Sequence, residues 1–141
     1  MIINAENLIL GRFATIAAKK ALEGETVSVV NCEKAVIVGR KIEILKRYKA
    51  RVNRGTPRKG PFFPKVPDRL VRRAIRGMLP WDKSRGREAF KRIMCYIDVP
   101  ENFKSEKIET FDKINVYNTN NINFINIGEI CENLKKNEWK A

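Results

Sequence analysis

The sequence contains no histidine among its 141 residues. Imidazole is the usual general base at neutral pH and a common metal ligand, so its absence excludes the ordinary catalytic triads and histidine-ligated metal sites. The three cysteines, Cys32, Cys95 and Cys131, lie far apart, and none has a partner at CxxC spacing. We therefore expect no metal site and no cofactor, and three small buried hydrophobic side chains in a reducing compartment.

The chain also lacks a long apolar run. No stretch approaches the roughly 20 residues of a membrane-spanning helix. The N-terminus has no basic region followed by a long apolar segment, as a secretory signal would. The length and the hydrophobic share of 43% are typical of one ordinary globular core. We expect a single cytoplasmic domain over residues 1–141, with no membrane and no small-molecule substrate among its partners.

Acidic residues are scarce in one third of the chain, and the cations gather there. Residues 46–92, the basic block, hold seventeen of the twenty-nine lysines and arginines and three acids, a net charge of +14. The remainder holds twelve bases and thirteen acids and nets −1. A solvated face normally mixes both signs, so the block favours a polyanionic ligand such as nucleic acid. An anionic membrane would require large apolar residues beside the cations, and helical wheels place the apolar arc opposite them.

Apolar periodicity predicts an α/β scaffold in the first forty residues. Residues 2–3 indicate a strand, and helical spacing over 11–23 indicates a helix that Gly24 can end in the left-handed conformation. The nearly continuous β-branched runs at 26–31 and 35–38 are typical of strands covered on both faces in a parallel sheet.

The turn before that first helix invites comparison with phosphate-binding loops. Such loops need several glycines, because the backbone N–H groups must approach the phosphates closely. Gly11 stands alone, and no Gly-Lys-Ser or Gly-Lys-Thr follows it. We interpret Gly11 as part of an ordinary strand–helix turn.

The basic block begins with a predicted helix and a loop. Residues 41–52 are predicted as a helix with Ile42, Leu45 and Val52 facing inward. Residues 53–66 contain glycines and prolines too closely spaced for a regular element. We expect this loop to be poorly ordered alone and to be ordered by phosphates on binding.

The block continues with a helix that starts at Pro67 and stops at Pro80. On a helical wheel, one arc is apolar and contains Leu70, Val71, Ala74, Ile75, Met78 and Leu79. The opposite arc contains Arg69, Arg72, Arg73 and Arg76. Guanidinium groups suit bidentate contact with phosphate oxygens, so this arc is a candidate binding face. After Trp81 and the turn at 82–87, we expect a shorter basic helix over 88–94.

Two stretches resemble the large-subunit ribosomal protein family numbered thirteen, in its archaeal type. Residues 7–41 read NLILGRFATIAAKKALEGETVSVVNCEKAVIVGRK, and residues 69–96 read RLVRRAIRGMLPWDKSRGREAFKRIMCY. The similarity runs from residue 1 to about 103 and is loose over 104–141, where we expect only a helix from Ile127. The resemblance implies an α/β fold of three layers, α/β/α, with a small, mostly parallel sheet and a basic Gly/Pro-rich extension.

The same resemblance implies a function. The family is a structural constituent of the large ribosomal subunit that binds large-subunit ribosomal RNA, supports early assembly and contacts neighbouring ribosomal proteins. The candidate RNA-binding residues are Lys46, Arg47, Arg51, Arg54, Arg58, Lys59, Lys65, Arg69, Arg72, Arg73, Arg76, Lys83, Arg85, Arg87 and Lys91. Phe62, Phe63 and Trp81 are candidates for stacking on unpaired bases, and a buried role for one or more of them stands equally open.

Two other classes of function would make different demands on the sequence. An enzyme acting on RNA or nucleotides would need a base, a metal cluster or a phosphate loop, and the carboxylates Glu33, Glu43, Asp98 and Asp112 are scattered. A regulator that binds messenger RNA outside the ribosome would use the same basic surface, and the sequence leaves it open. The acid-rich residues 101–112 are expected to form a solvated connection that can also meet a basic neighbouring protein.

Overall fold

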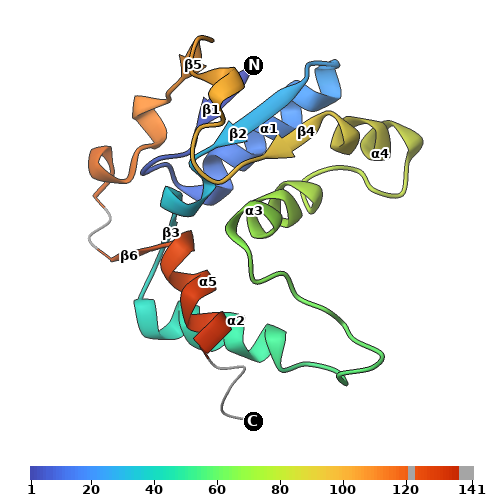
Figure 1. Ribbon diagram of the computed structural model, residues 1–141, viewed down its shortest axis with the longest axis vertical. Coiled ribbons are helices and arrows are strands. Elements are labelled where there is room, and N and C mark those ends of the chain that lie inside the picture. Colours follow the sequence, from blue (N-terminus) through green and yellow to red (C-terminus); the bar gives the residue numbers. More distant parts are fainter. Residues whose placement is uncertain (121–122, 137–141) are drawn as a thin grey trace.

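The structure, a computed structural model, describes residues 1–120 and 123–136 (Figure 1). It has the predicted α/β class. The strands are β1 (Ile2–Asn4), β2 (Val27–Val30), β3 (Val36–Val38), β4 (Ile93–Cys95), β5 (Ile108–Glu109) and β6 (Phe124–Asn126). The α-helices are α1 (Leu10–Glu23), α2 (Lys41–Val52), α3 (Pro67–Arg76), α4 (Ser84–Lys91) and α5 (Ile127–Lys136). The short 3-10 helices are η1 (Cys32–Lys34), η2 (Glu101–Phe103), η3 (Asp112–Ile114) and η4 (Val116–Asn118).

The main sheet has four strands in the order β4-β2-β1-β5, and every neighbouring pair is parallel. In its centre Ile3 lies opposite Val29, and Val29 lies opposite Cys95. The unit β1–α1–β2 is the strand, helix and strand that the periodicity predicts. Gly24 ends α1 with a φ of 105°, in the left-handed region that glycine tolerates without strain. The mostly parallel sheet expected from the sequence is thus confirmed.

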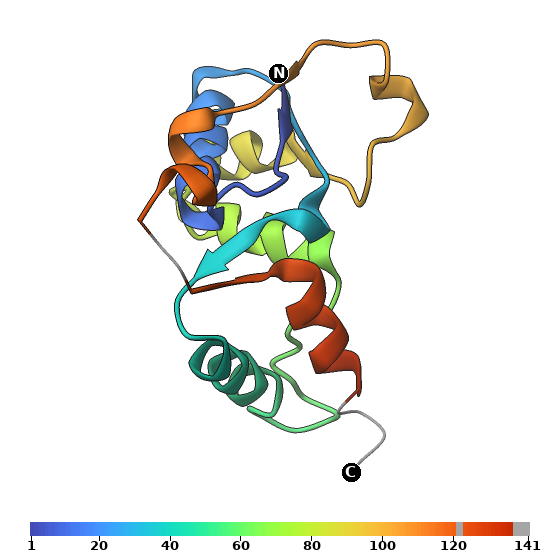
Figure 2. The ribbon, with the colours of Figure 1, turned by 90° about the vertical axis from the view of Figure 1, so that its left-hand side faces the viewer.

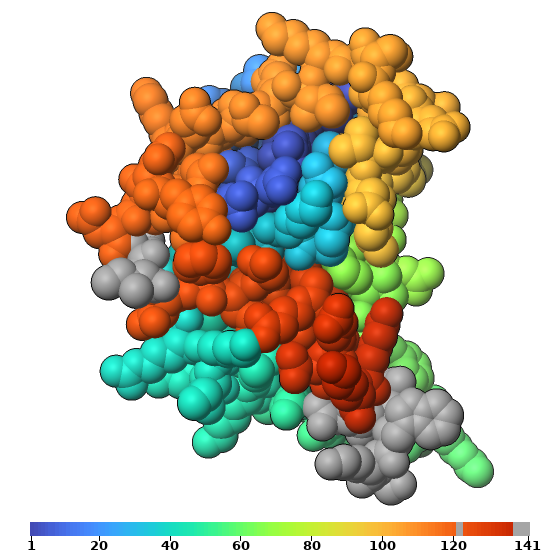
Figure 3. All heavy atoms as spheres, turned by 60° about the vertical axis from the view of Figure 1, so that its left-hand side comes forward, coloured from blue at the N-terminus to red at the C-terminus, as the bar shows by residue number. Residues whose placement is uncertain are grey.

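One face of the main sheet is covered by helices. Helix α1 contacts α3 and α4, and its side chains Phe13, Ala14 and Ala17 are fully buried. Val71 and Ile75 of α3 are buried in the same core. The other side carries the segment with η2 (Figure 2). That cover is partial, because atoms of β1 and β2 reach the surface between α5 and the segment from β5 to η4, drawn in orange (Figure 3).

The expectation that residues 35–38 join the parallel sheet is wrong. Strand β3 pairs antiparallel with β6 in a separate two-stranded sheet, with Ile37 opposite Ile125. The turn through η1, entered at Asn31 with a φ of 56°, directs the chain away from β2. An apolar run indicates that a strand is buried, but it does not indicate which strand will pair with it.

Helix α2 has the predicted bounds, and its buried face differs in part from the prediction. Ile42 is 81% exposed, although the wheel placed it inward. Ile44 and Tyr48, one turn apart, are the buried residues, while Leu45 is half-buried. Helix α5, which begins at the predicted position, contacts α2, and this tertiary contact selects the face that is covered.

The expected helix over 88–94 is also placed incorrectly. Helix α4 begins at Ser84, inside the predicted turn, and residues 93–95 form β4 of the main sheet. Gly86 permits the early start, because a Cβ atom there would lie 2.0 Å from the carbonyl oxygen of Pro80. Met78, predicted in the core, is 41% exposed, because α3 ends at Arg76 and the chain turns before Leu79.

The three cysteines are buried, as predicted. Burial raises the pKa of the Cys131 thiol to about 11. A side-chain hydrogen bond with Cys95, together with burial, raises the pKa of the Cys32 thiol. Within residues 1–120 and 123–136, no helix has the length and apolar character needed to cross a bilayer. The last residues of the predicted 1–141 domain, 137–141, lie outside the described residues.

Candidate nucleic-acid interface

The loop between α2 and α3 is closed by backbone hydrogen bonds. The N–H of Thr56 donates to the carbonyl of Gly60 (3.2 Å), and the N–H of Gly60 donates to the carbonyl of Thr56 (2.9 Å). Gly55 has a φ of 93°, and a Cβ atom there would lie 2.1 Å from the carbonyl oxygen of Gly60. The close approach therefore requires glycine. It leaves Arg58 and Lys59 exposed at the tip of the loop.

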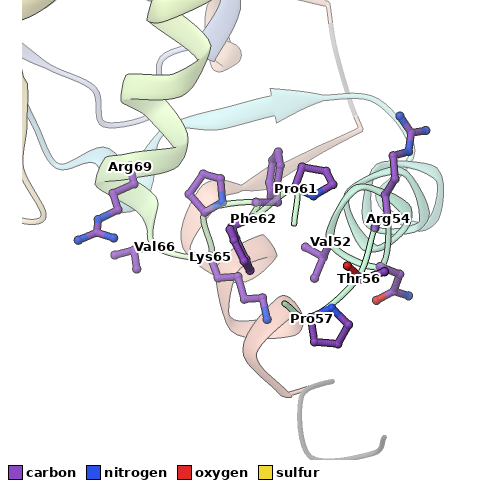
Figure 4. A pocket seen from close by; sticks show the side chains of 13 residues that line it. Val52, Arg54, Thr56, Pro57, Pro61, Phe62, Lys65, Val66 and Arg69 are labelled. Carbon is purple, nitrogen blue, oxygen red and sulfur yellow. The ribbon is translucent and has the colours of Figure 1, made fainter. Parts of the chain in front are cut away.

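A line of hollows runs from this loop along α3. The first, of about 610 Å³, lies between the loop and the start of α3 (Figure 4). The second is lined by Arg51, Arg54, Pro61, Phe63 and Arg73. The third is lined by Tyr48, Arg51, Phe63, Leu70, Arg73, Ala74 and Gly77. The last is lined by Arg73, Arg76, Gly77, Leu79, Pro80, Trp81 and Asp82.

Neighbouring hollows share lining residues, and Arg73 borders the last three. We call this line of hollows, with Arg51, Arg54, Arg73 and Arg76 along it, the arginine groove. Its cations come from α2, from the loop and from α3, which are separate in the sequence and adjacent in the fold. The groove thus gathers part of the +14 block on one surface.

Aromatic rings support the guanidinium groups of the groove. The Cζ of Arg76 lies 4.0 Å from the ring centroid of Trp81, and that of Arg73 lies 4.9 Å from the centroid of Phe63. Arg51 lies over Tyr48 of its own helix at 5.4 Å. The attraction between a cation and a ring face holds each guanidinium in place. The Nη1 group of Arg73 also donates to the backbone carbonyl of Phe62 (3.4 Å). The other N–H groups at the edges of the guanidinium groups remain available for a ligand.

Carboxylates do not compensate these arginines. In the described part of the chain, the salt bridges join Lys20 to Glu23 and Glu25, Lys34 to Glu6, Arg40 to Glu43, and Lys41 to Glu129. All of these residues lie outside the basic block. Among described residues no acid pairs with an arginine of the groove, so the groove keeps its positive potential.

The three predicted stacking residues have different environments. Phe62 is 72% exposed. Phe63 is half-buried, with its ring edge-on to Tyr48 at 5.8 Å and its face under Arg73. Trp81 is 36% exposed and lies between Arg76 and Phe90, whose ring centroid is 5.3 Å away. Phe62 is therefore the ring most open to a ligand, while Phe63 and Trp81 position arginines.

The structure brings some of the predicted cations to the hollows and leaves others apart. Those lining the hollows are Arg51, Arg54, Lys65, Arg69, Arg73 and Arg76. Those elsewhere are Lys46 and Arg47 on α2, Arg58 and Lys59 at the loop tip, Arg72 on α3, and Lys83, Arg85, Arg87 and Lys91 on and before α4. The side chain of Arg87 donates to the backbone carbonyls of Trp81 and Asp82, which ties the start of α4 to the turn before it.

Two aromatic residues of this surface, Tyr48 and Phe90, are not predicted from the sequence. Tyr48 lies under Arg51, and Phe90 lies under Arg72 at 4.5 Å. The spacing of Tyr48 three residues before Arg51 in a predicted helix is a usable signal, because such residues are neighbours on a helix surface. Phe90 and Arg72 lie on different helices, so no local spacing indicates their contact. Among the described residues, no group of three or more His, Cys, Asp or Glu side chains is placed to hold a metal ion.

Comparison with known proteins gives consistent results. A family model described as "Ribosomal protein L13" matches residues 1–102. A protein of Methanopyrus kandleri, described as "Large ribosomal subunit protein uL13", is 42% identical over 138 residues, which cover 94% of this chain and 85% of the relative. A protein of the same description from Haloarcula marismortui is 44% identical and covers 98% of this chain and 92% of the relative. Both alignments extend past residue 103, into the segment where the sequence resemblance is loose.

Proposed function

The chain belongs to the ribosomal protein L13 family, and from that premise we propose that it is a structural constituent of the large ribosomal subunit that binds large-subunit ribosomal RNA. As a member of a ribosomal protein family it is a structural protein and not an enzyme. Its place is the cytoplasmic ribosome, among neighbouring large-subunit proteins, and its role includes support of early subunit assembly.

The arginine groove is the observation that carries the proposal. Its four arginines have no carboxylate partner among described residues, and three of them lie against aromatic rings. Arginine matches the geometry of phosphate oxygens and is weakly hydrated, so it suits a partly enclosed contact with an RNA backbone. A-form RNA hides its major groove, so recognition is expected to rest on shape and phosphates.

The remaining predicted cations extend this surface. Lys46, Arg47, Arg58 and Lys59 lie on the α2 and loop side, and Lys83, Arg85, Arg87 and Lys91 lie on the α4 side. We propose that they neutralise phosphates around the groove, where several RNA segments meet. Arg72, held over the ring of Phe90, contributes positive potential more than direct contact.

The test is a salt titration of the purified chain with large-subunit ribosomal RNA. With about six phosphates neutralised, the logarithm of the binding constant should fall against the logarithm of salt concentration with a slope of roughly −4 to −5. A slope near zero contradicts the electrostatic account. Sedimentation of cell extract adds an independent measurement: the protein should migrate with the large subunit, and a protein found only in the soluble fraction contradicts the ribosomal role.

A further inference from the structure

The first hollow of the surface combines an apolar wall with a cationic rim. It has a volume of about 610 Å³ and lies between the end of α2, the loop and the start of α3. In Figure 4 the side chains of Val52, Pro57, Pro61 and Phe62 surround its interior. Arg54 and Arg69 extend from opposite sides of it, and the side chain of Lys65 also lines it. A ligand that fits must present a flat apolar part and a negative charge.

The backbone of the loop presents Phe62 to solvent. Phe63, its neighbour, turns inward to Tyr48 and Arg73. Successive side chains of an extended chain point in opposite directions, so the side chain of Phe62 points outward. Gly60 has a φ of 80°, and a Cβ atom there would lie 3.2 Å from the ring of Phe62. The ring thus packs against the backbone of Gly60 on one side and is 72% exposed overall. A phenyl ring so exposed inside a cationic loop has a free face and no covering side chain among the described residues.

We propose that this hollow binds one unpaired nucleotide of the RNA, with its base stacked on Phe62 and its phosphates near Arg54 and Arg69. The inference rests on the proposed function, because it needs an RNA in the groove. The volume lies within the range of about 300–1,000 Å³ of small-ligand pockets, which admits a nucleotide. Every base has a π-face, so stacking on an exposed phenyl ring is tolerant of sequence and needs no base-edge hydrogen bond.

A duplex cannot use this hollow, and that distinguishes it from the rest of the surface. Bases in an A-form helix are stacked and paired, so none is free to lie on Phe62. The guanidinium groups of the groove bind phosphates of either form. The hollow therefore gives the protein a preference for a loop, bulge or single strand at this one point, next to a surface that accepts any RNA backbone.

The test compares two probes with the full-length chain: a single-stranded RNA of about ten nucleotides, a length comparable to known single-strand sites, and a hairpin duplex of the same phosphate count. Phe62→Leu keeps an apolar side chain and removes the ring. It should weaken binding of the single strand by about 5- to 100-fold, the range for loss of one stacked base, and leave duplex binding unchanged. Phe62→Tyr should bind like the wild type.

Three controls make the outcomes distinguishable. Tyr117→Leu removes another aromatic ring that is 69% exposed and lies outside the groove, and should change neither affinity. A single strand that carries 5-iodouridine should photocrosslink to Phe62 in the wild type, and circular dichroism checks that each variant is folded. The nucleotide site is contradicted if Phe62→Leu and the wild type bind the single strand with equal affinity. It is also contradicted if Phe62→Leu loses the same affinity for the single strand and for the duplex. If the wild type binds neither the single strand nor the duplex, the proposed function itself is contradicted.

Discussion

At the scale of single residues, the notable feature is the ring beneath most arginines of the groove. A cluster of like charges repels and is costly to keep together. Here Arg76 lies over Trp81 and Arg73 over Phe63, so ring faces supply part of the attraction that carboxylates would otherwise supply. A carboxylate would cancel the charge that we propose to bind RNA, whereas a ring leaves it intact. The rings also restrict the side chains before binding, which reduces the entropy lost when phosphate arrives.

Trp81→Leu tests this role of the ring. The charge of Arg76 is unchanged, so the slope of binding against salt should stay the same. The affinity for ribosomal RNA should fall by about 2- to 10-fold, as expected for an exposed cation–π contact of roughly 0.5–1 kcal/mol together with lost preorganisation. Trp81→Phe should restore most of the affinity. A change of slope in Trp81→Leu, measured by titration at several salt concentrations, contradicts the positioning role.

The buried thiol of Cys131 should make the stability of the protein depend on pH. The folded state raises the pKa of Cys131 to about 11, against about 8.5 in an unfolded chain. Above pH 8.5 the unfolded chain loses this proton first, so ionisation favours unfolding. The contribution of Cys131 to the free energy of unfolding should therefore be constant below pH 8.5. It should fall as the pH rises towards 11.

The measurement is urea unfolding at pH values from 7 to about 10.5. Cys131→Ala should lower stability at pH 7, because it leaves a cavity beside buried Ile130 and Leu134. Its stability should fall less steeply than that of the wild type above pH 8.5. Parallel curves for the two proteins show that Cys131 is not responsible for the alkaline loss.

At the scale of elements, α3 joins the core to the arginine groove. Leu70, Val71 and Ile75 are buried against α1 and β4, while Arg73 and Arg76 face the groove. The helix starts at Pro67, which fits the first turn because its nitrogen needs no partner there. Arg72 lies at the border between the two faces. Its Nε is buried without a hydrogen-bond partner among described residues, and its contact with Phe90 of α4 offsets part of that cost.

The contact between α4 and the preceding turn depends on one glycine. A Cβ atom at position 86 would lie 2.0 Å from the carbonyl oxygen of Pro80, which is backbone and cannot rotate away. Gly86→Ala should therefore destabilise the protein by about 1–3 kcal/mol or more, the usual cost of overpacking. It should also weaken RNA binding, because it displaces Trp81 next to Pro80.

Gly11→Ala is the matched control, since it is also a glycine in a helix and a Cβ atom there meets nothing within 4 Å. Alanine is a better helix former, so this variant should be as stable as the wild type or more stable by up to about 1 kcal/mol. Thermal unfolding of both variants decides the point. Equal stability of Gly86→Ala and the wild type contradicts the close packing of α4 on Pro80.

At the scale of the whole molecule, the charge is divided between a near-neutral scaffold and a cationic side. The main sheet, α1 and the segment after β4 lie in the part of the sequence that nets −1. Apart from Lys41, the cations of α2, the loop, α3 and α4 belong to the +14 block. Such a distribution steers the molecule towards a polyanion in one orientation, because the field is strongest on one side.

A charge-matched pair of triple variants tests this division. Replacement of Arg69, Arg73 and Arg76 by Gln should reduce the magnitude of the salt slope by about 2–3, roughly 0.7–0.9 for each lost phosphate contact. Replacement of Lys104, Lys107 and Lys113 by Gln lowers the net charge equally at exposed positions outside the block. That control should leave the slope nearly unchanged. Equal effects of the two triple variants show that net charge, and not the groove, governs binding.

Much of the local structure follows from the sequence alone. The period of 3.6 identifies α1, α2 and α3, and it separates Leu70 and Val71 from the arginines of α3. The concentration of cations in residues 46–92 and the lack of histidine are properties of composition, which no fold can change. The charge asymmetry predicts a polyanionic ligand, and the two matched stretches indicate the family. These inferences need only the composition of the chain or residues that are neighbours in it.

Other features were decided by the tertiary structure, because they depend on residues that are distant in the chain. Strands β4, β5 and β6 have two or three residues each, too few for a period of 2 to be recognised, and pairing with β1, β2 and β3 defines them. The two phenylalanines at 62 and 63 are alike in the sequence, and only the position of Tyr48 and Arg73 turns one inward and leaves the other in solvent. Periodicity determines which side of an element is apolar, whereas long-range packing determines what covers it.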